Sequence, residues 1–330
     1  MMPCSSCRTV LAATNKCLAQ TNKSHTGGKA TKRRNRQANR YWPCGIVSTA
    51  ELVEEQMTYT GEISRDHPTC FLFVIDQSGS MDEKMGSRSK ADFVADVLNK
   101  TLATLVANCN KADGVRSYFD IGVIAYGGNG VISGLSGDLI QPISKIWERP
   151  LRVEERTKKS DDGAGGIIDQ RIKFPVWFDP TSSGGTPMCA ALTKAAEAVV
   201  EWCDAHPASY PPTILHVTDG QSTDGNPEHI ADGIRQISTQ DGTCLLFNLH
   251  VTTSEGREVL FPSSEQGLAD EYSRMLFRMS SELPSHVGRF ASGKGYTVGD
   301  GARGFIFNGD PKCIVDFFEI GTRPRLISER

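Results

Sequence analysis

Polar side chains directly follow an apolar run in the sequence FLFVIDQSGSM, where Asp76, Ser78 and Ser80 are each separated by one residue. The apolar run over 69–76 has the length and composition of a strand that is buried on both faces. An acid and two hydroxyls at the end of such a strand supply oxygen atoms, the ligands that Mg²⁺ prefers. The pattern therefore indicates a cation site at the carboxyl end of a buried strand.

Two further oxygen-bearing residues stand at comparable places later in the chain. Asp219 follows the apolar run 213–218, and Thr186 follows a glycine-rich stretch at the start of a predicted helix over 186–203, where we expect it to be the N-cap. In an open α/β sheet, ligands bind beyond the carboxyl ends of the strands, where loops converge. Three loops would therefore bring five side chains to one rim: Asp76, Ser78, Ser80, Thr186 and Asp219.

This donor set combines three neutral hydroxyls with two carboxylates that act directly or through water. Such ligands leave a bound Mg²⁺ electron-poor, with one position open for an outside anion. Any one of these serines, threonines or acids would more often be an ordinary turn or cap residue. The metal site is indicated by their joint placement, not by any single loop.

The elements that must position these residues alternate between strand and helix. Helical periodicity covers 89–109 and 186–203, and a Pro-started helix follows a short strand within 301–322. Apolar runs typical of buried strands cover 69–76, 118–127, 213–218 and 244–252. The alternation predicts right-handed crossovers and a doubly wound α/β fold, with a mostly parallel sheet and helices on both faces.

Residues 146–180 are unusual for a minimal domain of this kind. Apolar and polar residues alternate on either side of SDDGAGG, which is typical of a β-hairpin. The predicted hairpin insertion directly precedes the loop that carries Thr186. It is either a decorative surface hairpin or a wall beside the metal that helps to select a partner.

Residues 1–50 differ in composition from the rest of the chain. They contain no acid, although the whole chain has 39 Asp and Glu, and they are predicted to be a basic, disordered segment. A folded domain is expected over 68–320, followed by a tail at 321–330. Cys4 and Cys7 have the spacing of half a zinc site, but no second pair is present. The basic arm could contact nucleic acid, although most such runs are solvated tails, so nucleic acid is not the expected partner.

The cysteines and the hydropathy predict the compartment. Hydrophobic residues make up 38% of the chain, and no window approaches the apolar length of a membrane-spanning helix. The first 20 residues lack the apolar stretch of a signal peptide. Six cysteines stand singly at apolar or helical positions, as buried thiols do in a reducing compartment. We therefore expect a cytoplasmic protein without a membrane partner.

The sequence does not predict an enzyme. His216 lies inside a buried strand and is expected to be a satisfied core histidine, as is His250. The phosphate-loop spacing at 288–295 has Gly295 where a Ser or Thr would hold Mg²⁺. No nucleophile is paired with a base. A Mg²⁺-dependent hydrolase and a nucleic-acid binder that uses the basic arm are the alternatives to a binding module.

The pattern Asp76-x-Ser78-x-Ser80, followed by Thr186 and by Asp219 in TDG, resembles the metal-ion-dependent adhesion site of von Willebrand factor type A domains. The resemblance covers about residues 68–320. It implies that the three hydroxyls bind Mg²⁺ or Mn²⁺ directly, that the two acids bind directly or through water, and that a partner protein supplies a Glu or Asp.

Two stretches, DQSGSM and GGTPM, look most like bacterial intracellular members of this family. Some of those members are associated with Ser/Thr kinases and phosphatases or with tellurium-type stress resistance. The resemblance thus implies a metal-dependent protein-binding module that serves as a scaffold or regulator.

Overall fold

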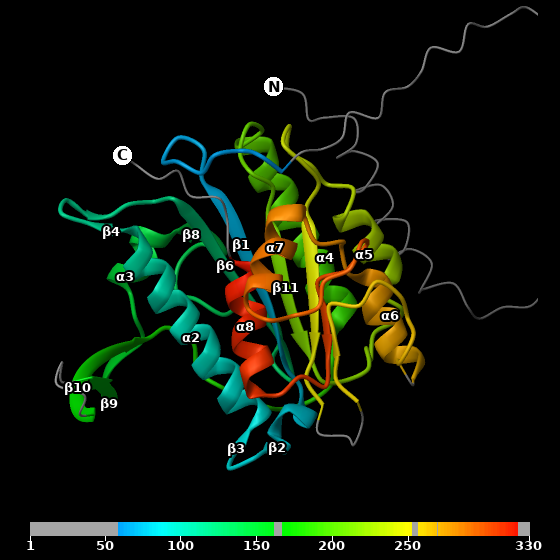
Figure 1. The fold of residues 1–330 in the computed structure, drawn as a ribbon, viewed down its shortest axis with the longest axis horizontal. Coiled ribbons are helices and arrows are strands. Elements are labelled where there is room, and N and C mark those ends of the chain that lie inside the picture. Colours follow the sequence, from blue (N-terminus) through cyan, green and yellow to red (C-terminus); the bar gives the residue numbers. More distant parts are fainter. Residues whose placement is uncertain (1–58, 162–166, 253–256, 269, 323–330) are drawn as a thin grey trace, which may run out of the picture.

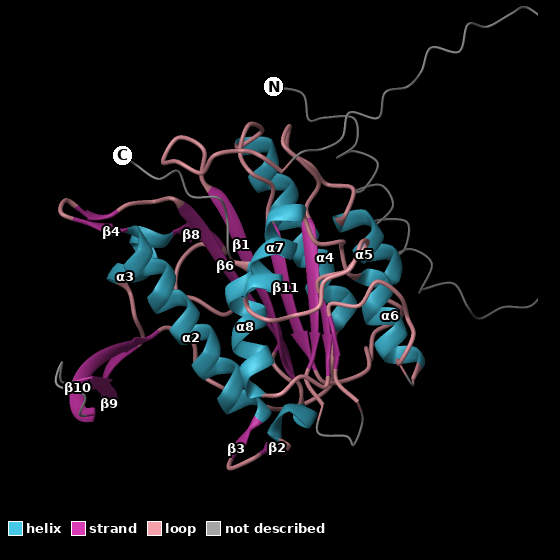
Figure 2. Cartoon of the chain, in the orientation of Figure 1, coloured by secondary structure: helices cyan, strands magenta, loops and turns pink. Residues whose placement is uncertain are grey.

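The computed structural model describes residues 59–161, 167–252, 257–268 and 270–322. A central eight-stranded sheet has helices on both of its faces (Figure 1, Figure 2). The predicted fold class, a doubly wound α/β fold with a mostly parallel sheet, is confirmed. The predicted basic segment 1–50 and the last residues of the predicted tail, 323–330, lie outside the described residues.

The strands of the sheet follow a spatial order that differs from their order in the chain. From one edge to the other they are β13 (Val259–Leu260), β14 (Phe305–Phe307), β12 (Leu245–His250), β11 (Thr213–Thr218), β1 (Thr69–Gln77), β6 (Phe119–Gly127) and β7 (Gly130–Ser133), with β8 (Ile140–Pro142) also on β6. The strands from β14 to β6 pair in parallel, whereas β13, β7 and β8 pair antiparallel at the edges. All nine residues of β1 are buried, because this strand has neighbours on both sides and helices on both faces.

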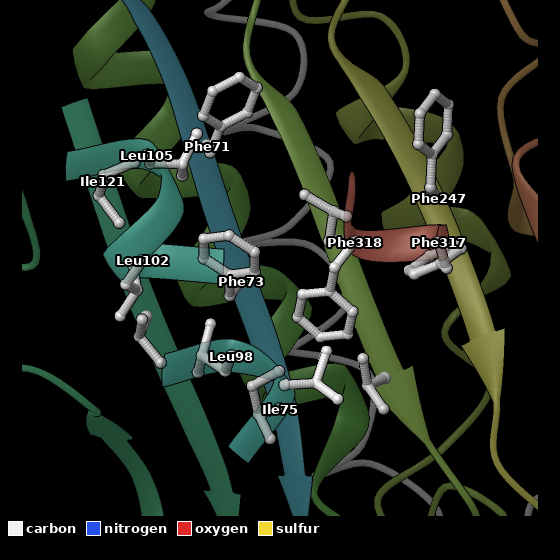
Figure 3. Packing of buried hydrophobic residues seen from close by; sticks show 14 of the residues in the cluster. Phe71, Phe73, Ile75, Leu98, Leu102, Leu105, Ile121, Phe247, Phe317 and Phe318 are labelled. Carbon is white, nitrogen blue, oxygen red and sulfur yellow. The ribbon is translucent and has the colours of Figure 1, made fainter. Parts of the chain in front are cut away.

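One helical layer packs on the odd-numbered side chains of β1. This layer contains α2 (Lys90–Cys109), α3 (Ile143–Glu148), α7 (Ser285–Gly293) and α8 (Pro311–Gly321). Phe71, Phe73 and Ile75 belong to this core, and the ring of Phe73 stacks on Phe318 with a centroid distance of 5.7 Å (Figure 3).

The second layer packs on the even-numbered side chains of the same strand. Cys70, Leu72 and Val74 contact a core formed by α4 (Met188–Ala205), α5 (Glu228–Ile234) and α6 (Glu271–Met279). The alternation of the strand therefore divides the interior into two cores, as expected for a strand covered on both faces.

The start of α2 is fixed by a capping box. Ser89 Oγ accepts a hydrogen bond from Asp92 N at 3.0 Å, and Asp92 Oδ2 accepts one from Ser89 N at 3.3 Å. The cap places the first turn of α2 directly after the short helix η1 (Gly79–Asp82) and the ribbon of β2 (Lys84–Met85) and β3 (Arg88–Ser89). The predicted helix over 89–109 is confirmed.

The start of α4 differs from the prediction. The helix begins at Met188 with Pro187 as its N-cap, so Thr186 is not the N-cap. The backbone amides of Cys189 and Ala190 donate to the carboxylate of Asp224, each at 2.9 Å. Because an acid from a distant loop takes the capping role, the Thr186 hydroxyl is not needed for it.

The predicted hairpin insertion is present as β9 (Arg152–Asp161) and β10 (Ile167–Val176), which pair antiparallel. Figure 1 shows it projecting from the body of the molecule beside α2. A further small ribbon joins β4 (Asn110–Lys111) and β5 (Gly114–Val115) after α2. None of the helices in the described part of the chain has the length and apolar character needed to cross a membrane.

Candidate metal centre

The two predicted acids lie at the point where the sheet changes its winding direction. β1 leads to α2 on one face of the sheet, and its neighbour β11 leads to α5 on the other face. Asp76 is near the carboxyl end of β1, and Asp219 directly follows β11. In Figure 1 these strands point to the lower edge, where β2 and β3 lie. This switch point is where open α/β sheets bind their ligands.

Asp76 is fully buried and is held in place by two hydrogen bonds. Ser78 N donates to Oδ1 at 2.8 Å, and Thr218 Oγ1 donates to Oδ2 at 2.7 Å. Burial raises the pKa of Asp76, and these donors partly offset that effect by favouring the charged form. The role of Thr218 was not predicted, because it depends on the pairing of two strands far apart in the sequence.

Hydroxyl groups connect the β1 loop with the second acid. Ser78 Oγ and Ser80 Oγ lie 3.1 Å apart, and Ser80 Oγ donates to Asp219 Oδ1 at 2.6 Å. The side chain of Asp219 has no exposed surface. Side chains from two neighbouring strand ends therefore form one hydrogen-bonded group of oxygens.

The Thr186 hydroxyl lies beside Gly220, next to the group of oxygens formed by Ser78, Ser80 and Asp219. A Cβ atom on Gly220 would lie 3.4 Å from Ser80 Oγ and 3.5 Å from Thr186 Oγ1, so both hydroxyls border the space that the glycine leaves. Two hydrogen bonds of 3.0 Å hold this loop, one from Thr186 N to Thr223 Oγ1 and one from Thr223 N to Thr186 O. The structure thus brings all five predicted side chains to one rim, and their assignment as metal ligands stays a prediction.

A buried cation that was not predicted also enters this group. Lys90, the first residue of α2, is 3% exposed, and its Nζ donates to Asp219 Oδ2 at 2.9 Å and to Glu83 Oε2 at 2.7 Å. Positive charge is unfavourable at a helix N-terminus, and burying an ammonium group is costly. The contact with the two acids offsets both costs.

The donor set fits a hard divalent cation. The rim holds two buried carboxylates, Asp76 and Asp219, and only Asp219 is shown in contact with the buried ammonium of Lys90, so a second positive charge would be stabilised here. Each carboxylate oxygen named above accepts one hydrogen bond and keeps a lone pair for a metal. No group of three or more His, Cys, Asp and Glu that could hold a metal occurs among the described residues. A metal at this rim would therefore depend on the hydroxyls.

His216 is a satisfied core histidine, as predicted. Its Nε2 accepts a hydrogen bond from the Tyr126 hydroxyl at 2.7 Å, and its Nδ1 donates to Asn248 Oδ1 at 2.8 Å. Burial lowers the pKa of His216 to about 4, so the ring is neutral at physiological pH. His250 is also buried, and its Nδ1 has no hydrogen-bond partner among the described residues. Both ring nitrogens of His216 are thus bound to buried core residues, so neither is available as a base at the rim.

Two acids of the rim loops have structural roles that the sequence did not predict. Asp224 caps α4 and Glu83 pairs with Lys90, although both residues are exposed. Met81, which follows Ser80 in the rim loop, is fully buried in the core beneath the rim. A loop sequence alone contains no signal for these contacts, because each depends on a segment elsewhere in the chain.

No family model and no curated protein matches the sequence. Solved structures similar to this chain include the vWF domain of the type V pili tip protein Mfa5 from Porphyromonas gingivalis. It is 14% identical, with a TM-score of 0.33, over 80% of this chain and 99% of that chain.

Two more similar structures are parts of longer chains. The pilus adhesin SpaC from Lactobacillus rhamnosus GG is 12% identical, with a TM-score of 0.41, over 78% of this chain and 30% of its own. Manganese-loaded TRAP protein from Plasmodium vivax is 12% identical, with a TM-score of 0.32, over 57% of this chain and 59% of its own. This chain therefore spans less than two thirds of either protein.

Proposed function

We propose that this chain is a von Willebrand factor type A domain protein whose rim residues bind Mg²⁺ or Mn²⁺ and capture a carboxylate of a partner protein. The observation that carries the proposal is the continuous oxygen group from Ser78 through Ser80 to Asp219, with Thr186 across Gly220. When bound, the metal supplies positive charge with one position open to an outside anion. The chain itself supplies the orientation of the ligands.

Lys90 sets the conditions under which a metal enters. Without a metal, its ammonium neutralises Asp219 at 2.9 Å, so an incoming cation competes with Lys90 for that carboxylate. Glu83 lies on the other side of the ammonium at 2.7 Å and is half exposed, so it can keep Lys90 paired after Asp219 turns to the metal. We therefore expect metal binding to be weaker than in a site without this lysine.

The hairpin of β9 and β10 is the part of the rim that we assign to partner selection. Arg152 at the base of the hairpin donates to Asp179 Oδ1 at 2.6 Å, and Gln77 Nε2 donates to the Asp179 carbonyl at 3.3 Å. Asp179 thus connects the base of the hairpin with the residue that follows Asp76. Since a metal ion cannot distinguish one carboxylate from another, neighbouring surfaces must provide specificity.

We further propose a scaffold or regulator that acts in the cytosol and is not an enzyme. Five of the six cysteines among the described residues are buried, as thiols are in the proteins of a reducing compartment. A partner among Ser/Thr kinases or phosphatases is proposed from the sequence resemblance alone.

The metal assignment is tested by calorimetric titration of Mg²⁺ into the full chain. Asp219→Asn should abolish binding, because the amide removes a charge that the neutral hydroxyls cannot supply. Asp138→Asn is the matched control, since Asp138 is exposed in the loop between β7 and β8, and it should bind as the wild type does. A folded Asp219→Asn variant with wild-type affinity for Mg²⁺ would show that the assignment is wrong.

The carboxylate capture is tested with a partner identified by a pull-down that compares Mg²⁺ with EDTA. The purified partner is then titrated against the wild type and Thr186→Val, each with Mg²⁺ and with EDTA. Binding should be strong only for the wild type with Mg²⁺. Equal affinity in all four conditions would exclude the metal from partner binding.

A further inference from the structure

A second candidate site lies at the opposite edge of the sheet from the metal centre. A cavity of about 790 Å³ opens at the amino ends of the parallel strands, where Leu245, the first residue of β12, forms part of its wall. Pockets that bind organic ligands typically have volumes of about 300–1,000 Å³. The cavity is therefore large enough for more than a single inorganic ion.

Three arginines from three different segments line this cavity. Arg235 follows α5, Arg289 lies in α7, and Arg303 precedes β14. Glu282 is the one acid among the described residues of the lining. Arg235 pairs with Asp232, but no described acid forms an ion pair with Arg289 or Arg303. The lining therefore carries an excess of positive charge.

The guanidinium of Arg303 is held in a fixed position. Its Nη1 donates to the backbone carbonyls of Arg278 and Ser280, each at 3.0 Å. Burial lowers the pKa of Arg303 and the positive charge of Arg235 lowers it further, while the charges of Glu282 and Glu265 partly offset these effects. Arg235 Nε is buried and has no hydrogen-bond partner among the described residues. A bound anion would offset the repulsion between these two cations and could accept hydrogen bonds from both.

The first turn of α7 also faces this cavity. Pro284, the N-cap of α7, provides no side-chain cap, and Ser285 and His286 of the first turn are part of the lining. The amide groups and the dipole at a helix N-terminus favour anions. Tyr59 and Leu283 add apolar surface to the wall. Cationic and apolar surfaces thus meet in one cavity.

We propose that this cavity binds a small organic phosphate. A phosphate monoester presents up to two negative charges and three terminal oxygens, which matches several guanidiniums and a helix N-terminus better than a carboxylate with one charge and two oxygens. Arg235, Arg289 and Arg303 would contact the phosphate, and the organic part would lie along Tyr59 and Leu283. The proposal is independent of the metal centre and of its partner.

The test uses phenyl phosphate, titrated into the full chain in EDTA and followed by calorimetry. Arg289→Gln should weaken binding by about tenfold or more, because a charge-assisted hydrogen bond is lost. Arg289 is exposed, so its replacement should leave the fold intact. Glu282→Gln should have the opposite effect and tighten binding, since it removes the acid from the lining.

Arg171→Gln is the matched control, because Arg171 is an exposed arginine on β10, outside the cavity lining. It should leave the affinity for phenyl phosphate unchanged. Inorganic phosphate should bind more weakly than phenyl phosphate, because it lacks a ring to contact the apolar wall, and equal affinity for the two would overturn the assignment of an organic ligand. Equal weakening in Arg171→Gln, unchanged affinity in Arg289→Gln, or no binding of phenyl phosphate to the wild type at millimolar concentration would overturn the proposal.

Discussion

Lys90 is a buried lysine at the start of a helix, held there by contacts with Asp219 and Glu83. We predict that Lys90→Met binds Mg²⁺ about tenfold more tightly or better, since the cation no longer competes with an ammonium for Asp219. In EDTA the variant should be less stable than the wild type, because a buried carboxylate loses its counter-ion. Calorimetry measures the first effect, and urea denaturation measures the second.

Lys84→Met is the matched control for this change. Lys84 lies on β2 in the same loop region, but its side chain is exposed. Its replacement should alter neither the affinity for Mg²⁺ nor the stability in EDTA. If Lys90→Met bound Mg²⁺ with wild-type affinity while Asp219→Asn did not bind it, the metal site would be supported. The proposed competition between Lys90 and the metal for Asp219 would then be wrong. If neither the wild type nor Lys90→Met bound Mg²⁺, the metal centre itself would be wrong.

The contrast between Asp76 and Lys90 explains which parts of the site could be predicted. Asp76, Ser78 and Ser80 follow a buried strand directly, so the local sequence places them at the rim of the sheet. Lys90 is the first residue of an amphipathic helix, where a lysine usually points to solvent. Its contact with Asp219 joins positions 129 residues apart. Only the packing of α2 against the switch point brings the two together.

Helix α4 receives its cap from another loop, and this cap also positions the rim. Asp224 accepts the amides of Cys189 and Ala190, while its neighbour Thr223 holds the backbone of Thr186. We predict that Asp224→Ala lowers the free energy of unfolding by about 1 kcal/mol and weakens Mg²⁺ binding, because the Thr186 loop is less firmly placed. Urea denaturation and calorimetry measure the two effects.

Glu197→Ala provides the comparison for this cap. Glu197 lies on the exposed face of the same helix, so the substitution changes charge and helix propensity without removing a cap. It should leave both quantities close to those of the wild type. A destabilised Asp224→Ala variant with unchanged Mg²⁺ affinity would show that the cap stabilises α4 but does not affect the metal site. That result would contradict the predicted weakening of Mg²⁺ binding.

The hairpin can be removed at a point where its two strands are paired. Arg152 stands opposite Val176, so replacing residues 153–175 by Asn-Gly would close the chain with a two-residue turn. We predict a loss of only about 1 kcal/mol, because the ion pair between Arg156 and Asp96 at 2.8 Å is partly exposed. Mg²⁺ affinity should be unchanged and partner affinity should fall.

Arg156→Ala alone serves as the control for the lost ion pair. If the shortened protein bound the partner as the wild type does, the hairpin would be a surface decoration. If Arg156→Ala reproduced the whole effect on partner binding, the arginine and not the hairpin would be the determinant.

The elements that the sequence did not reveal are mostly short edge strands. β1 and α2 were predictable because each has a long, regular pattern of apolar residues, and Ser89 marks the start of the helix. β7 has four residues and none of them is buried, while β13 has only two. Segments of this length have no periodicity to detect, and their pairing depends on the strand beside them.

The described chain begins with an anchored segment, which sets how much can be removed. The amides of Thr60 and Gly61 both donate to Asp241 Oδ1 at 2.9 Å, and the Tyr59 hydroxyl lies 2.9 Å from Thr243 Oγ1. We predict that a chain starting at Glu51 has the same midpoint of urea denaturation as the full chain. A chain starting at Glu62 should be less stable, because these contacts are absent.

This pair of truncations also tests the prediction for residues 1–50. Failure of the chain from Glu51 to fold would show that the basic segment contributes to the core. Stoichiometric zinc in the purified full chain would likewise contradict a segment that has no structural role, since Cys4 and Cys7 have the spacing of half a zinc site.

A buried polar network connects the sheet with its second helical layer. It runs from Tyr126 on β6 over β1 to His216 on β11, then to Asn248 on β12, whose Nδ2 donates to Ser280 Oγ at 2.9 Å, just after α6. Asn248 Oδ1 can only accept, so it requires the proton on His216 Nδ1, and Nε2 is left to accept from Tyr126. The network therefore fixes the tautomer of the ring, while burial keeps the ring neutral; the hydrogen bond to Asn248 raises the pKa of His216 and only partly offsets the burial.

This network makes the stability of the whole fold depend on pH. The pKa of His216 is about 4 in the fold, below the usual value of about 6.5. At a pH between these two values, the unfolded chain binds a proton on His216 that the folded chain does not bind. The resulting contribution, on the order of 3 kcal/mol, is fully present above about pH 6.5 and is lost as the pH falls to about 4. Other groups also make the free energy of unfolding depend on pH, among them Asp76, whose raised pKa acts in the opposite direction.

The contribution of the histidine is the difference in the free energy of unfolding between the wild type and His216→Gln. Urea denaturation from pH 7.5 to 4 should show a shallower loss of stability for His216→Gln, and a slope like that of the wild type for the exposed His229→Gln. Parallel curves for all three proteins would mean that His216 is protonated equally in the folded and unfolded states, and the pH dependence would have to come from the acids.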